Sequence, residues 1–319
     1  MRYRKFISRT LKIVVSLGLI TFLVVKISPG KLAYNLRRIE PAYLVLAVVV
    51  FFISNLLGSL QWHQLLRATG IVLPFSCTFR LYFKGLFFNN FLPANVGGDA
   101  VKIYDVSRTG NDPYKVFSVT LLDRVIGITG LCILAVVSSI LLMPYGSVAN
   151  LELYFTIFAV CILSIILLVS SKRLSRWIRT LFGRVRIWSM GERFDMIFDH
   201  LGDFKGKKTL LVRLMMLALS VQFLRVTTHI LVGYSLGIEM TVVNLICFFV
   251  FIPLLGLIMV LPISINGLGI REGAGILLFT EIGFLEEQAL LMEFITYAVM
   301  VAVSIIGGIF FIQRSFKGD

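Results

Sequence analysis

Long apolar stretches, separated by short polar segments, run along almost the whole of this chain. A helix needs about 20 apolar residues to cross the hydrocarbon core of a bilayer. Stretches of roughly that length lie at residues 11–28, 42–66, 114–143, 151–170, 209–235 and 286–312. The pattern predicts an all-α, polytopic membrane protein with six transmembrane helices.

Two further apolar regions, residues 75–95 and 242–282, are each interrupted by a polar, glycine-rich break. The first break reads Leu-Pro-Ala-Asn-Val-Gly-Gly-Asp at residues 92–99, and the second reads Leu-Pro-Ile-Ser-Ile-Asn-Gly-Leu-Gly at residues 261–269. Irregular backbone survives at membrane depth only where protein or a water-filled cavity covers it. Similar breaks in corresponding places of two halves indicate a transporter-type binding site.

The distribution of lysine and arginine predicts the topology. The N-terminus and residues 171–208 are rich in basic residues, which favour the cytoplasmic side of a membrane. The N-terminus and residues 171–208 both lie on the cytoplasmic side if residues 75–95 and 242–282 each dip into the membrane and return on the side from which they enter. An eight-span alternative keeps the termini in place but moves other basic residues to the outer face. We therefore expect six spans and two re-entrant hairpins in the cell (inner or plasma) membrane, with both termini cytoplasmic.

This topology makes the two hairpins enter from opposite faces of the membrane. Residues 11–143 and 151–312 then form an inverted repeat within a single integral membrane domain, residues 1–319. Inverted repeats allow one binding site to face either side in turn. The alternative is that both breaks are ordinary helix-breaking loops within spans.

The composition supports a membrane protein and excludes a soluble one. Apolar residues make up 58% of the chain and charged residues 15%, with a mean hydropathy of +0.91. The net charge of +14 is explained by basic loops at an anionic membrane surface, so we expect no nucleic-acid partner. Residues 171–208 interleave basic and apolar side chains, which indicates a helix on the inner leaflet or a solvated loop. The cysteines lie in apolar segments and the histidines are scattered, so we expect no metal and no cofactor.

Polar and glycine residues at the first break form a candidate anion site. Successive N–H groups in glycine-rich backbone can form an anion-binding nest. A helix following at about residues 98–109 would favour negative charge at its N-terminus. Asp99 is placed to cap that helix, and capping alone is the alternative role for it. The candidate residues here are Asn89, Asn90, Asn95, Gly97, Gly98 and Asp99.

Polar residues at the second break form the matching candidate. Arg271 offers a planar donor fork suited to phosphate. An arginine this deep in an apolar segment must be paired or line a cavity, and Glu272 is the nearest partner in the sequence. A purely structural pair between Arg271 and a carboxylate is the alternative. The candidate residues here are Ser264, Asn266, Gly267, Gly269, Arg271 and Glu272.

Two of the predicted spans carry polar residues at membrane depth. Asp123 and Arg124 lie within one of them, and Gln222, Arg225 and His229 lie within another. Intramembrane ionisable residues indicate a functional site. His229 on its own is more typical of a satisfied interior histidine. The other residues would line one polar cavity together with those at the breaks, in which arginines hold a phosphate and carboxylates balance the charge or carry a proton. Internal pairing of Asp123 with Arg124 is the alternative.

The two breaks and the intramembrane Asp123-Arg124 pair together resemble the lysylphosphatidylglycerol synthase transmembrane region family, which includes flippase-like, uncharacterised UPF0104-type proteins. The resemblance covers nearly the whole chain. In full-length synthases this region is implicated in flipping aminoacylated phosphatidylglycerol, and a separate soluble domain makes the lipid. We expect that domain, and hence lysyltransferase activity, to be absent here. Family members also accompany glycosyltransferase domains that act on polyprenyl-phosphate lipids. The chain departs from the family at Lys102, where members often carry arginine.

These observations predict a flippase-like lipid transporter. It would bind and translocate an anionic head group, either phosphatidylglycerol-derived or polyprenyl-phosphate-linked, and its expected partners are that lipid and a glycosyltransferase or lipid synthase. The sequence contains no nucleophile–base constellation, so we expect no catalytic residues. A membrane-embedded transferase using Asp99 or Asp123 as a base is one alternative. A lipid-binding scaffold acting through residues 171–208 is the other.

Overall fold

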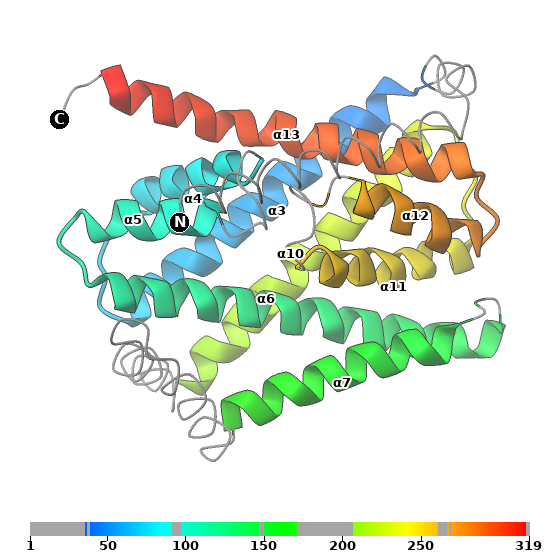
Figure 1. Cartoon of the computed structure of the whole chain (residues 1–319), viewed down its shortest axis with the longest axis horizontal. Helices are drawn as coiled ribbons and strands as arrows, with labels where there is room; N and C mark the ends of the chain where they lie inside the picture. The colour runs from blue at the N-terminus through cyan, green and yellow to red at the C-terminus, as the bar shows by residue number, and fades with distance from the viewer. Residues whose placement is uncertain are drawn as a thin grey trace, which may run out of the picture.

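The computed structural model is built from helices (Figure 1). It describes residues 36, 39–90, 97–146, 148, 150–170, 207–260, 267 and 269–316. The predicted first span, residues 11–28, and nearly all of the basic loop predicted at residues 171–208 lie outside the described residues.

Most of the long helices match the spans predicted from the apolar pattern. Four described helices are long and apolar enough to cross a membrane. They are α3 (Pro41–Ala68), α6 (Pro113–Leu142), α10 (Lys208–Ser235) and α13 (Glu286–Phe316). A fifth predicted span forms α7 (Leu151–Ser170). The prediction of a multi-pass helical membrane protein is therefore confirmed, whereas the full number of spans stays a prediction.

Local sequence signals explain where some of these helices begin. Proline, which suits the first helical position because its missing N–H has no intrahelical partner there, opens both α3 and α6. The Asp112 side chain accepts a hydrogen bond from the Tyr114 backbone N–H at 3.0 Å. The Thr241 hydroxyl oxygen likewise accepts a hydrogen bond from the Asn244 backbone N–H at 3.1 Å, at the start of α11 (Val242–Ile258).

Each glycine-rich break separates two shorter helices. The first lies between α4 (Phe75–Asn89) and α5 (Gly97–Ser107), and the second lies between α11 and α12 (Ile270–Thr280). The central residues of the breaks, 91–96 and 261–266, lie outside the described residues. A helix on either side of a break is what a hairpin requires, while re-entry into the membrane stays a prediction.

Helices α4 and α5 approach each other backbone to backbone. A Cβ atom added at Gly98 would lie 2.0 Å from the carbonyl oxygen of Gly85, so only glycine fits at this position. The Gly98 N–H donates a hydrogen bond to Asn89 Oδ1 at 2.8 Å. Gly98 and Gly85 therefore allow α5, with Asp99 in its first turn, to lie tightly against α4.

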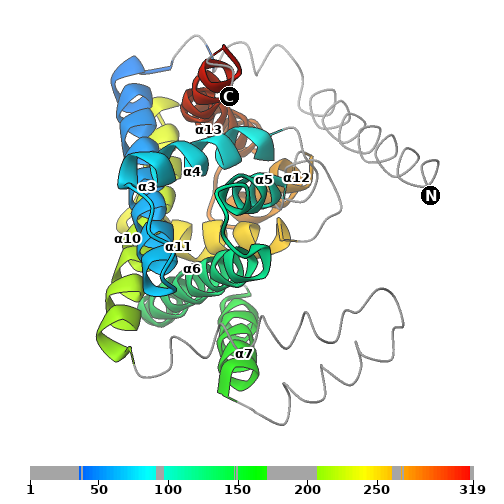
Figure 2. The ribbon, with the colours of Figure 1, turned by 90° about the vertical axis from the view of Figure 1, so that its left-hand side faces the viewer.

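The helices of the two halves pack in a reciprocal pattern. Exchanging α3 with α10, α4 with α11, α5 with α12 and α6 with α13 converts each major contact among these eight helices into another observed contact or into itself. The α4–α13 contact becomes α11–α6, the α5–α6 contact becomes α12–α13, and α3–α10 maps onto itself. Figure 2 shows α3 and α10 side by side at one edge of the molecule. The packing thus relates the two halves as equivalent units.

Polar and apolar residues are distributed as expected for a protein surrounded by lipid. Large apolar side chains are exposed along α3, α6, α7 and α10, for example Val49, Val137, Leu163 and Met216. Charged side chains such as Arg271 and Glu293 are buried between helices instead. Intramembrane charges normally face the interior of a helix bundle in this way.

Candidate functional site

The first group of buried charges lies between α5 and α6. Asp99 forms ion pairs with Lys102 Nζ at 2.7 Å and with Arg124 Nε from α6. Asp99 lies inside the first turn of α5 rather than at the N-cap position that we expected. Its carboxylate therefore joins two helices through its ion pair with Arg124. We call Asp99, Lys102, Asp123 and Arg124 the α5–α6 cluster.

Neighbouring helices complete the α5–α6 cluster. Gln61 Nε2 on α3 donates a hydrogen bond to Asp123 Oδ1 at 2.8 Å. The Lys102 ammonium lies 5.0 Å from the ring centroids of both Trp62 and Tyr82, a distance at which the negative ring faces attract a cation. Lys102 is therefore held between a carboxylate and two aromatic rings.

Arg124 is the accessible member of the α5–α6 cluster. Its side chain is 38% exposed, compared with 10% for Asp99 and 8% for Lys102. The positive charges of Lys102 and Arg124 balance the negative charges of Asp99 and Asp123. Arg225 on α10 lies within electrostatic range of Tyr82, beside this cluster, and adds a further positive charge. The surroundings therefore carry a positive surplus, which suits an anion.

Three of the predicted site residues bridge helices. Gln222 Nε2 on α10 donates to the Gly127 carbonyl oxygen at 3.0 Å, Asn89 accepts from Gly98 as described above, and Asn90 Nδ2 donates to Ser304 Oγ on α13 at 2.6 Å. These bonds give the three residues structural roles next to the cluster. A role for them in binding a ligand stays a prediction.

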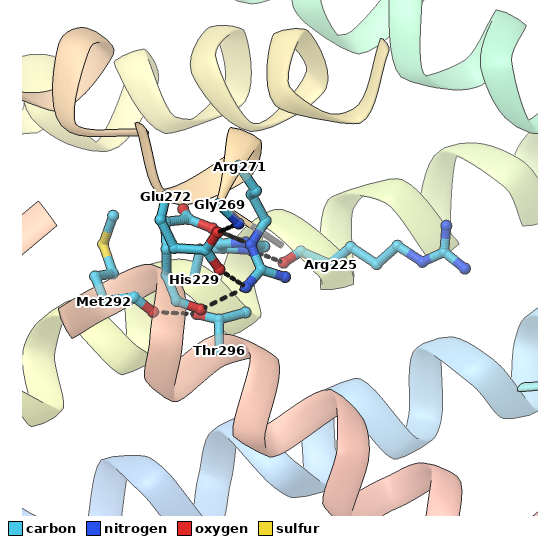
Figure 3. Close-up of polar contacts among 8 residues, drawn as sticks. Arg225, His229, Gly269, Arg271, Glu272, Met292 and Thr296 are labelled. Carbon is cyan, nitrogen blue, oxygen red and sulfur yellow. Dashed lines mark hydrogen bonds and ion pairs between the residues drawn. The ribbon is translucent and has the colours of Figure 1, made fainter. Parts of the chain in front are cut away.

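The second group of charges lies between α12 and α13. Arg271 Nη2 donates to Glu272 Oε1 at 2.6 Å and to the Glu293 carbonyl oxygen at 3.0 Å. Arg271 Nε lies 3.0 Å from Glu293 Oε2 as an ion pair, and its guanidinium carbon lies 5.1 Å from the ring centroid of Tyr297. Figure 3 shows the side chains of Arg271 and Glu272 close together between the two helices. We call Arg271, Glu272 and Glu293 the α12–α13 cluster.

Burial distinguishes the α12–α13 cluster from the first. The Arg271 side chain is 2% exposed, and those of Glu272 and Glu293 are fully buried. One guanidinium faces two carboxylates, so the formal charge is negative when both acids are ionised. The guanidinium of Arg271 is occupied by two carboxylates here. Its role in phosphate binding therefore stays a prediction.

His229 connects α10 to the α12–α13 cluster. Its Nδ1 lies 3.0 Å from the Arg225 carbonyl oxygen, and its Nε2 lies 3.9 Å from Glu293 Oε2. Arg225 itself extends away from Arg271 in Figure 3. The contacts of the described residues therefore form two clusters, with Arg225 near the first and His229 at the second, while a shared cavity stays a prediction.

Glycines at the second break adopt backbone that requires them. Gly267 and Gly269 have φ angles of 76° and 84°, in the left-handed region that side chains disfavour. The Gly269 N–H donates to Glu272 Oε2 at 2.6 Å, which fixes the first turn of α12. The predicted site residues Asn95, Ser264 and Asn266 lie outside the described residues.

Sequence reasoning missed three residues that the clusters use. Glu293 lies inside the apolar stretch 286–312, and the rule that singled out Asp123 would also have identified it. Lys102 was noted only as a departure from a family pattern. Gln61 carried no signal, because an amide within a span becomes informative only once its partner, Asp123, is known.

Comparison with known proteins places these clusters in a wider context. A family model described as the lysylphosphatidylglycerol synthase TM region matches residues 9–308. A UPF0104 membrane protein of Methanothermobacter thermautotrophicus is 24% identical over 294 residues, which cover 85% of each chain. A second UPF0104 membrane protein, from Pyrococcus horikoshii, is 30% identical over 96 residues, or 29% of each chain.

Proposed function

Because this chain belongs to the lysylphosphatidylglycerol synthase transmembrane region family, we propose that it binds an anionic lipid head group within the bilayer and moves it between leaflets. The observation that carries this proposal is the partly exposed side chain of Arg124 in a helix long and apolar enough to span a membrane. A charge at the centre of a membrane helix costs about 3 kcal/mol on insertion scales. An arginine retained there, with 38% of its side chain exposed, supports a role in holding a negative ligand.

The α5–α6 cluster allows a phosphate to bind without leaving a charge uncompensated. Asp99 occupies one face of Arg124 and is also paired with Lys102. A head-group phosphate could replace the Asp99 carboxylate at Arg124 while Lys102 continues to neutralise that carboxylate. A bidentate arginine–phosphate contact is strong and geometrically specific. Asp123, held by Gln61, would balance the remaining positive charge.

The reciprocal packing of the two halves supports translocation as well as binding. Equivalent halves that enter the membrane with opposite orientation form an inverted repeat, the architecture associated with alternating access. In this proposal α4–α5 and α11–α12 are the two opposed hairpins, and their breaks meet the head group near the middle of the bilayer. The lipid tails stay in the hydrocarbon while the head group passes between the hairpins.

A translocation assay in proteoliposomes tests the proposal. The protein would be reconstituted with phosphatidylglycerol or polyprenyl phosphate carrying a fluorescent acyl chain, and the accessible leaflet would be bleached with dithionite. We expect loss of the protected signal with wild-type protein and a reduction of at least about tenfold in rate with Arg124→Ala, equivalent to about 1.4 kcal/mol of activation free energy.

A matched control and chemical analysis complete the assay. Arg213→Ala removes an exposed arginine from α10 and should leave the rate unchanged. Chemical modification of the lipid would instead support a transferase, whereas binding without translocation would support a scaffold. Equal rates for Arg124→Ala and wild type would contradict the role of Arg124.

A further inference from the structure

We propose that Glu293 is a proton-binding site, and that its protonation couples proton movement to head-group translocation. This inference rests on the proposed function and adds an energy source to it. It concerns the α12–α13 cluster, whose carboxylates are buried, rather than the accessible Arg124.

The hydrogen bonds identify Glu293 as the carboxylate that takes the proton. Glu272 has a partner on each oxygen, since Arg271 Nη2 bonds Oε1 and the Gly269 N–H bonds Oε2. Neither carboxylate oxygen of Glu293 has a hydrogen-bond partner among the described residues, although the Arg271 Nε lies 3.0 Å away. A fully buried carboxylate without hydrogen bonds is costly to keep ionised, whereas a protonated one is neutral.

The orientation of His229 supplies the second argument. A carbonyl oxygen only accepts hydrogen bonds, so the contact from Nδ1 to the Arg225 oxygen assigns the ring proton of a neutral imidazole to Nδ1. Nε2 is then an acceptor, and it faces Glu293 Oε2 at 3.9 Å. At this distance, which is beyond hydrogen-bond length, the Nε2 lone pair and an ionised Glu293 repel each other, and a proton on Glu293 removes that repulsion.

The charged groups around Glu293 come from three helices. α12 contributes Arg271 and Glu272, α10 contributes His229, and Glu293 with Tyr297 lies on α13. With both acids ionised the cluster has one positive and two negative charges. One added proton makes it neutral, so we expect the site to take up one proton.

Protonation would also change what Arg271 can bind. An ionised Glu293 holds the Nε side of the guanidinium, and Glu272 holds Nη2. When an oxygen of Glu293 takes a proton from the aqueous phase, its attraction for Nε falls and Arg271 keeps only Glu272 as an ionic partner. The freed side of the guanidinium can then accept a phosphate, so the head-group anion and the proton travel together as a neutral pair.

Infrared difference spectroscopy on purified protein in nanodiscs tests proton binding without any transport. Lowering the pH should produce a protonated-carboxyl C=O band in the wild-type protein, and the band should be missing in Glu293→Gln. Glu286→Gln is the matched control, because Glu286 is exposed in the first turn of the same helix. A buried carboxyl band that persists in Glu293→Gln would overturn the assignment.

A pH gradient across the proteoliposomes tests the coupling itself. For one proton per lipid, the distribution of fluorescent phosphatidylglycerol between leaflets should shift by up to about tenfold per unit of gradient. A protonophore should abolish the shift, and Glu293→Gln should translocate without responding to the gradient.

Wild-type translocation that ignores the gradient would overturn the coupling and leave the proposed function standing. Absence of wild-type translocation would overturn the proposed function and the coupling together, whereas the infrared band reports on the proton site independently.

Discussion

The α5–α6 and α12–α13 clusters have the same framework and different chemistry. Each has a carboxylate in the first turn of a short helix, Asp99 in one and Glu272 in the other. Each has a second carboxylate on the following long helix, Asp123 or Glu293. A polar side chain from the paired helices α3 and α10 contacts that second carboxylate: Gln61 in the first cluster and His229 in the second.

The difference lies in the positive charges and in access. The first cluster has Lys102 and Arg124, and Arg124 is 38% exposed. The second has only Arg271, which is 2% exposed. A repeated framework can therefore hold an accessible, charge-balanced site in one half and an occluded, negatively charged site in the other. This division assigns the accessible head-group site to the first cluster. It assigns the proton site, whose protonation frees Arg271 for the phosphate, to the second.

Removal of Arg271 should have the largest effect on stability. Arg271→Ala leaves two fully buried carboxylates without their cation, and breaking a buried ion pair from one side costs about 3–5 kcal/mol. We expect a large fall in the midpoint of thermal aggregation in detergent, measured by size-exclusion chromatography after heating. The double variant Arg271→Ala with Glu293→Gln should recover part of the loss, because one of the uncompensated charges is gone. A double variant no more stable than Arg271→Ala would contradict the charge argument.

A comparison of two glycines in the short helices should give an intermediate effect. Gly98→Ala forces a Cβ against the Gly85 carbonyl oxygen, and overpacking of this kind costs about 1–3 kcal/mol. Gly273→Ala in α12 places its Cβ in open space and should leave stability unchanged or raise it by up to about 1 kcal/mol. The same heating assay measures both. Equal destabilisation would show that α5 does not depend on its close contact with α4.

Replacement of Arg124 should have the smallest effect on stability. Its side chain is more than a third exposed, so its ion pair with Asp99 contributes about 1 kcal/mol or less, and Asp99 keeps Lys102 as a partner. Arg124→Ala should therefore remain as heat-resistant as wild type while losing translocation. A loss of stability comparable to that of Arg271→Ala would remove the distinction between the clusters.

The helices of this fold could be predicted from sequence, because lipid imposes a simple length and polarity requirement. Residues 114–143 and 286–312 became α6 and α13 within a few residues. The glycine-rich breaks likewise marked the ends of helices. The packing of the halves could not be predicted, since α3–α10 contact depends on which faces meet, and spans that are apolar all round give little periodic signal.

Most residues of the candidate site could be predicted from the sequence, but their contacts with one another could not. Asp99, Arg124, Arg271 and Glu272 were identified because charges are costly at membrane depth. Their division into two clusters depends on tertiary contacts between helices far apart in sequence, such as Arg271 with Glu293. Gln61 became informative only once its contact with Asp123 was known, since spacing along one helix does not report its partner on another.

One parallel measurement tests the division of roles between the clusters most directly. Wild type, Arg124→Ala and Glu293→Gln would be reconstituted in identical vesicles, and translocation of fluorescent phosphatidylglycerol would be followed with and without a pH gradient. We predict that Arg124→Ala loses translocation in both conditions, whereas Glu293→Gln retains it without a gradient and loses only the response to the gradient. Identical behaviour of the two variants would contradict the account.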